Sequence, residues 1–417
     1  MGGSHAHHAD DHVPEVPVGA GARITLLTAL ALIGAVTLWG LVSYWPRTDP
    51  RPSDSAAAGI APGVTFPHAE VLKVHPACPR TAQGESGSGY QPPGSKVGSS
   101  AEGCGQLTSR VESGQMAGKV VTVTVPPEVS RSGIAPGDSV QLIQMPTQGQ
   151  APAFSLFSVD RSVAIWWLAG IFVLTVAVVA RLRGLLALVG LAFGAWVLVK
   201  FMLPALLTGE SGLAVALVGS TAIMYVVLYL AHGPSLRTSA ALGGTLVGIA
   251  ITAATGLVAV DTQRLSGVAD ETGSLLTSFV GEVNFQGLLT CAIIIAGLGV
   301  LNDVTITQAS SVWELRSASP AMPRRELFTS AMRIGRDHIA STIYTIVFAY
   351  AGTALSVLLL LFLYDRPVLE LLSTEDIAEE VTRTLASAIG LVLAVPATTA
   401  IAVATVTPRR SRGRRSR

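Results

Sequence analysis

The chain has 417 residues, of which 50% are hydrophobic and 13% are charged, and its formal net charge is +1. The charged share is roughly half that of soluble globular proteins, and the mean hydropathy is +0.53. Several apolar runs approach or exceed ~18 residues, the length that crosses a hydrocarbon core of ~30 Å. These features exclude an ordinary soluble enzyme and predict a polytopic membrane protein with one domain outside the membrane.

The chain begins with a polar segment, residues 1–23, that is predicted to be a cytoplasmic tail. Its histidines and aspartates could bind a metal, but a tail without a defined site is the favoured interpretation. The first apolar run, 24–46, is longer than the hydrophobic region of a signal peptide, so it is predicted to be an uncleaved transmembrane anchor. A linker rich in Pro, Ser and Ala follows at 47–61.

Residues 62–160 are predicted to form a small all-β domain. Short runs of β-branched or alternating residues indicate strands at 70–74, 119–125, 139–145 and 154–159. Strands of this kind are typical of a small barrel or sandwich, with the OB-fold as one candidate.

Two of the three cysteines, Cys78 and Cys104, lie in this β-rich region, while Cys291 lies in a later apolar run. In an oxidising compartment Cys78 and Cys104 could form a disulfide. Two free thiols are the alternative, and the spacing does not resemble a zinc site.

The remainder of the chain, 161–407, is predicted to be a seven-helix transmembrane domain, which gives eight helices with the anchor. The helices are expected at 163–181, 185–206, 212–232, 238–260, 286–311, 339–364 and 384–406. The final residues, 408–417, are strongly basic. Next to an apolar segment, such a tail favours a membrane-surface anchor over a nucleic-acid site.

Arginines and acidic residues occupy alternate connections between these helices. The arginines at 181–183, 237 and 316–336, together with the basic tail, fall on one side if the helices simply alternate. The connections on the other side are acidic. Because Lys and Arg accumulate in cytoplasmic loops, both termini are predicted to be cytoplasmic, with the β-domain outside a cell membrane.

Asp303 is the candidate functional residue, because an ionised carboxylate inside a membrane costs several kcal/mol. The expected helix places it about two-thirds of the way across. Asn302 and Thr307 lie beside it. This pattern predicts a pathway for protons, ions or substrate. The alternative is that Asp303 lies near the cytoplasmic end and is simply solvated.

A second polar face is predicted on the following helix. His338, Ser341, Thr342 and Thr345 recur at helical spacing, so they line one face, which is expected to approach the region of Asp303. A carboxylate, a histidine and hydroxyls would suit a proton path. Alternatively, these are ordinary residues of a membrane interface and of helix packing.

The sequence contains no HExxH, P-loop or GxSxG signature, and no enzyme activity, catalytic residue, cofactor or metal is predicted. The expected partners are the lipid bilayer and either a second copy or another membrane protein. Nucleic acid is not an expected partner, and the substrate is unknown.

Two segments carry a resemblance to a known family. The run GLGVLNDVTITQASSVWEL at 297–315, followed by IGRDHIASTIYTIVFAYAG at 334–352, resembles the YibE/F-like membrane proteins, as does HGPSLRTSAALGGTLVG at 232–248. The resemblance covers roughly residues 60–405. It implies a membrane architecture with one outside domain and no particular activity.

A more distant similarity concerns the LND at 301–303, which resembles a segment of the SecF half of the proton-driven SecDF motor, an RND-type transporter. The resemblance implies that Asp303 carries a proton. The arginine expected near Ser341 is missing, although His338 lies one turn earlier, and the outside domain of SecF is α+β rather than all-β.

Two functions are therefore expected. The first is a proton-coupled transporter or translocation factor in which the β-domain captures or guides a substrate. The alternative is an envelope scaffold or sensor that does not transport and whose β-domain binds a partner.

Overall fold

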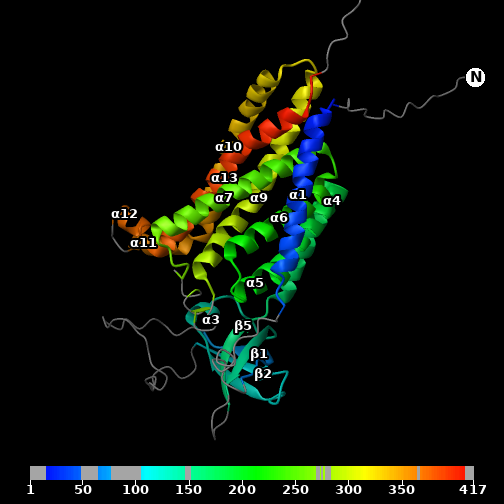
Figure 1. The fold of residues 1–417 in the computed structure, drawn as a ribbon. Helices are drawn as coiled ribbons and strands as arrows, with labels where there is room; N and C mark the ends of the chain where they lie inside the picture. Colours follow the sequence, from blue (N-terminus) through cyan, green and yellow to red (C-terminus); the bar gives the residue numbers. More distant parts are fainter. Residues whose placement is uncertain are drawn as a thin grey trace, which may run out of the picture. The chain divides into compact units, whose positions relative to one another are not determined.

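The computed structural model describes residues 16–47, 64–76, 105–145, 152–268, 273, 276–277, 283–363 and 367–408 (Figure 1). The chain divides into two compact units, Met1–Arg51 with Val176–Arg417 and Pro52–Thr175. The N-terminal histidines, the proposed Cys78–Cys104 pair and the basic tail lie outside the described residues.

The smaller unit contains a five-stranded antiparallel sheet in the order β3-β2-β1-β4-β5, which agrees with the β-rich character predicted for this region. The edge strands β3 and β5 also lie in contact, so the sheet curves into a partly closed barrel. Side chains alternate across each strand, and Val71, Leu107, Val140 and Leu142 are fully buried inside. The strands are β1 (His68–Val74), β2 (Gln106–Val111), β3 (Val120–Thr124), β4 (Ser139–Met145) and β5 (Ala153–Val159), with a short helix α3 (Pro127–Ser130) between β3 and β4.

Strand β2 is the one strand that sequence analysis missed among the described residues. Its inward positions are Leu107, Ser109 and Val111, so the alternation is present but includes a polar residue. β2 follows directly on a Gly- and Ser-rich stretch, and that composition favours a loop. Pairing with β1 and β3 supplies the backbone hydrogen bonds that make this segment a strand.

The remaining elements are helices. They are α1 (Ala20–Ser43), α4 (Ser162–Val197), the π-helix η1 (Leu198–Met202), α5 (Leu203–Leu207), α6 (Gly212–His232), α7 (Leu236–Gln263), α9 (Phe285–Ala318), α10 (Arg324–Thr353), α11 (Leu355–Leu363), α12 (Val368–Leu372) and α13 (Glu375–Thr405). Within the described residues, six helices are long and apolar enough to cross a membrane, or seven if α10 and α11, bent by 70°, form one span.

The difference from the eight expected helices arises mainly in α4. The helix continues through η1 and α5 as a 46-residue element, which would be ~69 Å long if straight. It breaks at Arg181, whose backbone is not helical (φ 51°, ψ −140°). A Cβ added to Gly184 would lie 2.6 Å from the Val176 side chain, so the axis bends sharply here. The break falls where the sequence predicts a turn between two helices.

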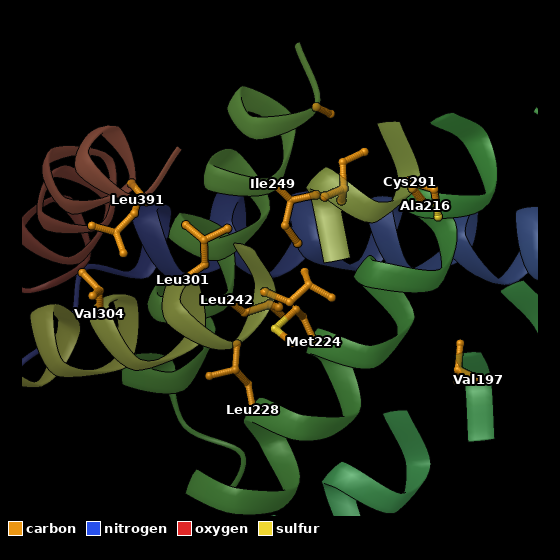
Figure 2. Packing of buried hydrophobic residues seen from close by; sticks show 14 of the residues in the cluster. Val197, Ala216, Met224, Leu228, Leu242, Ile249, Cys291, Leu301, Val304 and Leu391 are labelled. Atoms are coloured by element: carbon orange, nitrogen blue, oxygen red, sulfur yellow. The ribbon is translucent and has the colours of Figure 1, made fainter. Parts of the chain in front are cut away.

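Helices α7, α9 and α13 form the centre of the larger unit. Leu242 and Ile249 of α7, Leu301 of α9 and Leu391 of α13 meet in one hydrophobic cluster (Figure 2). Close approach depends on glycine. A Cβ on Gly248 would lie 2.6 Å from the end of the Leu301 side chain and 3.0 Å from Ala394, so a larger residue would force Leu301 to move.

The two ends of the described chain lie together. Val18 forms an antiparallel bridge with Val406, the Gly19 N–H donates to the Thr405 carbonyl at 3.1 Å, and the Thr407 N–H donates to the Pro17 carbonyl at 2.8 Å. The segments before α1 and after α13 are thus joined by backbone hydrogen bonds.

Candidate functional site on helix α9

The candidate site lies on α9, a continuous helix of 34 residues. Asn284 caps it, because its side-chain oxygen accepts a hydrogen bond from the Gly287 N–H at 2.9 Å. The helix begins one residue before the predicted start and continues seven residues past the predicted end. The added residues include Glu314 and Arg316, which an apolar pattern does not detect.

One part of the polar segment faces inward and joins helices. The Thr305 hydroxyl of α9 lies 2.6 Å from the Thr245 hydroxyl of α7, and both side chains are fully buried. Thr305 also donates to the Leu301 carbonyl at 2.8 Å. These hydroxyls are therefore satisfied within the bundle and serve packing.

Gln308 is the residue of α9 that reaches α10 and α13. Its side-chain amide donates to the Ala331 carbonyl at 3.0 Å and to the Thr399 hydroxyl at 2.7 Å. A Cβ on Gly335 would lie 2.9 Å from the Gln308 oxygen. The glycine thus allows α10 to pack directly over this buried amide.

Asp303 faces a different direction from Gln308. Five residues of helix rotate the side-chain direction by about 140°, and the Asp303 side chain is exposed. Among the described residues, none forms an ion pair or hydrogen bond with its carboxylate. Its backbone carbonyl accepts a hydrogen bond from the Thr307 hydroxyl at 2.8 Å.

Asn302, which precedes Asp303, is half-buried. Its side-chain oxygen is buried and has no hydrogen-bond partner among the residues that the structure describes. An unsatisfied buried acceptor is costly. The Asn302 oxygen could therefore accept a further hydrogen bond, and it lies beside the unpaired carboxylate of Asp303.

The predicted polar face of α10 is only partly inside the bundle. Thr342 is buried, His338 is half-buried, and Ser341 and Thr345 are exposed. Thr342 donates to the His338 carbonyl at 2.8 Å and Thr345 to the Ser341 carbonyl at 3.2 Å. Within the described part of the chain, no hydrogen bond or ion pair connects this face to Asp303, and Gln308 makes the polar contact between the two helices.

Sequence analysis missed the titratable neighbour of Asp303. His232, the last residue of α6, is influenced mainly by its burial, and it lies near enough to Arg237, Arg183 and Asp303 for their charges to act on it. Three helices thus bring charged groups to the end of α6. One feature of the sequence could have pointed to His232: it ends an apolar span and is followed by Gly233 and Pro234.

A second missed residue is Arg316, which is 1% exposed. Its guanidinium donates to the carbonyls of Pro320, at 3.3 Å, and Met322, at 2.6 Å. Arginine near a helix C-terminus commonly binds free carbonyls. Arg316 therefore fixes the turn between α9 and α10, although its charge alone suggested a cytoplasmic loop.

The arrangement is that of a helical bundle with membrane-length spans, a small β-barrel unit and a polar segment on a central helix. Residues 168–408 match the YibE/F-like protein family. The chain belongs to this family, as the motifs at 232–248, 297–315 and 334–352 indicate. Neither the curated proteins nor the solved structures include a match to the chain.

Proposed function

We propose that the protein is a multi-pass membrane transporter or translocation factor driven by proton exchange at Asp303. The proposed membrane location is supported by the exposed apolar surface of the helices. Trp166 and Trp167 of α4 are 76% and 72% exposed, and Phe348 of α10 is 72% exposed. Contiguous apolar surfaces of this kind are rare in water but ordinary against lipid.

The length of helix α6 gives an estimate of the depth of Asp303 in the membrane. Its 21 residues give a length of ~31 Å, close to the ~30 Å hydrocarbon core. A Cβ on Gly212, at the start of α6, would clash with the backbone of Gly287 on α9. Asp303 is sixteen residues further along α9, or ~24 Å. By this estimate, which supports the proposed depth, Asp303 would lie one or two turns inside the level where α6 ends.

An ionised carboxylate at this depth would cost up to roughly 3 kcal/mol against lipid. Protonation would remove this cost, and His232 is the proposed carrier of a proton that arrives from the end of α6. The observation that carries the proposal is therefore the exposed, unpaired carboxylate of Asp303 within electrostatic reach of His232. The similarity of the LND segment to SecF suggests the same role.

The barrel unit is proposed to capture the substrate outside the membrane. An OB-fold is the proposed assignment, supported by the order β3-β2-β1-β4-β5, the contact between β3 and β5, and the helix between β3 and β4. Barrels of this type bind extended polymers across the face of β2 and β3. This assignment supports a role in binding and does not identify the substrate.

The test uses a deletion strain and its growth or export phenotype. Asp303→Asn should abolish complementation, whereas Asp303→Glu should retain part of it, because only the carboxylates exchange a proton. Glu314→Gln, on the same helix and also exposed, is the matched control and should complement fully. Membrane levels of each variant are measured by immunoblot. Full complementation by Asp303→Asn would contradict the proposal.

The second candidate function is a scaffold or sensor. It is supported by the barrel unit, because small barrels of this type commonly bind a partner. In that case deletion of residues 64–159 should remove all function, while Asp303→Asn should be neutral. The two variants measured in the same strain therefore distinguish the two candidates.

A further inference from the structure

A long apolar groove runs along α1, beside α6 and the second half of α4. It has a volume of about 580 Å³, and its walls include Leu27, Ala31, Leu38, Phe193 and Val226. The two tyrosines of its floor do not offer free hydroxyls. Tyr225 donates to the Leu30 carbonyl at 2.5 Å, and the Tyr229 hydroxyl lies 2.9 Å from that of Ser239. The groove therefore suits a hydrocarbon ligand.

A cluster of aromatic side chains includes Phe193 of the groove wall. The rings of Phe193 and Trp196 lie 5.9 Å apart, and the ring of Trp45 lies 6.0 Å from Trp196. Nearby, α1 meets α6 tightly, since a Cβ on Gly40 would lie 2.6 Å from Val218.

Beside Leu27 the groove adjoins a second, largely apolar hollow of about 520 Å³, whose lining includes Pro234 and Leu236 together with the polar residues Arg23, Ser235 and Ser239. The hollow shares Leu27 and Tyr229 with the apolar groove, so the two are continuous. Arg23 lies one helical turn before Leu27 on the same face of α1. In the described residues, nothing pairs with or accepts a hydrogen bond from its guanidinium, so its donors are available to an anion.

The length and volume of the groove indicate which class of ligand it can bind. From Leu27 to Leu41 the groove follows ~21 Å of helix, longer than half of a ~30 Å hydrocarbon core. A partner helix ~10 Å wide and of that length would fill roughly 1,600 Å³, far more than the groove offers. A single hydrocarbon chain fits the length and the width.

We propose that this groove binds an anionic phospholipid of the surrounding bilayer, with one acyl chain along α1 and the headgroup phosphate at Arg23. Arginine matches phosphate oxygens in a bidentate geometry, and the cation at one end of an apolar groove is complementary to an amphiphile with an anionic head. The lipid would fix the angle between α1 and α6 and is independent of proton exchange at Asp303.

The experiment is native mass spectrometry of the full chain in a neutral detergent, titrated with phosphatidylglycerol or with phosphatidylcholine of the same acyl chains. The wild-type chain should bind phosphatidylglycerol about fivefold more tightly, the effect of one cation near an anionic lipid. Arg23→Gln should abolish this preference. Arg325→Gln removes an equally exposed arginine elsewhere and should leave it intact.

Groove occupancy is tested separately with Ala31→Trp, which fills the groove and should weaken binding of both lipids. Ala29→Trp places the same side chain on α1 outside the groove and should bind as the wild type does. Thermal unfolding in detergent identifies any variant that fails to fold. Equal affinity for the two lipids in the wild type, unchanged binding by Ala31→Trp, or equal binding of free glycerol phosphate would each overturn the proposal.

Discussion

At the scale of single residues, neighbouring polar side chains on α9 have opposite roles. Gln308 and Thr305 are buried and bonded to other helices, whereas Asp303 is exposed and unpaired within the described part of the chain. Sequence analysis identified Asp303 from the cost of its charge alone. It could not separate the two roles, because the direction of each side chain depends on which helices pack around α9.

Gln308→Ala should lower the stability of the bundle by about 1 kcal/mol, because it removes two interhelical hydrogen bonds and each contributes roughly 0.6 kcal/mol on average in a membrane protein. The control is Ser310→Ala on the same helix, which is half-buried and should shift stability by less than about 0.5 kcal/mol. The measurement is the midpoint of SDS-induced unfolding in mixed micelles. Equal midpoints for both variants would show that the Gln308 amide contributes nothing to packing.

At the scale of elements, the central helices pack through small residues. A Cβ on Gly244 of α7 would overlap the Thr398 side chain of α13, and one on Gly390 of α13 would overlap Thr252 of α7. Without a hydrophobic effect between helices in lipid, such close approach is what holds them together. The GxxxG spacing of Gly244 and Gly248 was visible in the sequence, but the partner helix was not.

Gly244→Ala should therefore disrupt the contact between α7 and α13 and lower the unfolding temperature in detergent, by an amount equivalent to about 2–3 kcal/mol of overpacking. The adjacent Gly243 is the matched control. Its Cβ would lie 3.4 Å from the flexible end of Ile401, so Gly243→Ala should be tolerated. If both variants unfold at the same temperature, the packing argument is wrong.

Element types were largely predictable because they follow local patterns. The strands β1, β3, β4 and β5 and the long helices match period-two alternation and extended apolar runs. β2 was missed because its inward Ser109 and its Gly-rich neighbour weaken the alternation. The break in α4 was predicted from Arg181 and Arg183, whereas the extension of α9 to Ala318 depends on the carbonyl bonds of Arg316 and was not predictable from apolar length.

At the scale of the whole molecule, charge placement predicts a topology that the pairing of the termini supports. Val18 and Val406 form a bridge, so the segments before α1 and after α13 lie at the same end of the bundle. The side of the membrane stays a prediction that rests on the arginine pattern.

Cysteine labelling tests this orientation in a background in which Cys78, Cys104 and Cys291 are serine. Arg131→Cys, in the barrel unit, should react with a membrane-impermeant maleimide in intact cells. Arg325→Cys, at the start of α10, is equally exposed and should react only after the membrane is opened. The reverse pattern would place the barrel unit in the cytoplasm.

The pairing of the termini also has a consequence for biogenesis. Pro17 and Thr407 are 390 residues apart, and ribosomes extend a chain at 5–20 residues per second, so roughly 20–80 s separate the synthesis of the two segments. During that interval the backbone groups around Val18 have no partner strand. The pairing around Val18 and Val406 can therefore form only after α13 and the residues that follow it have been synthesised.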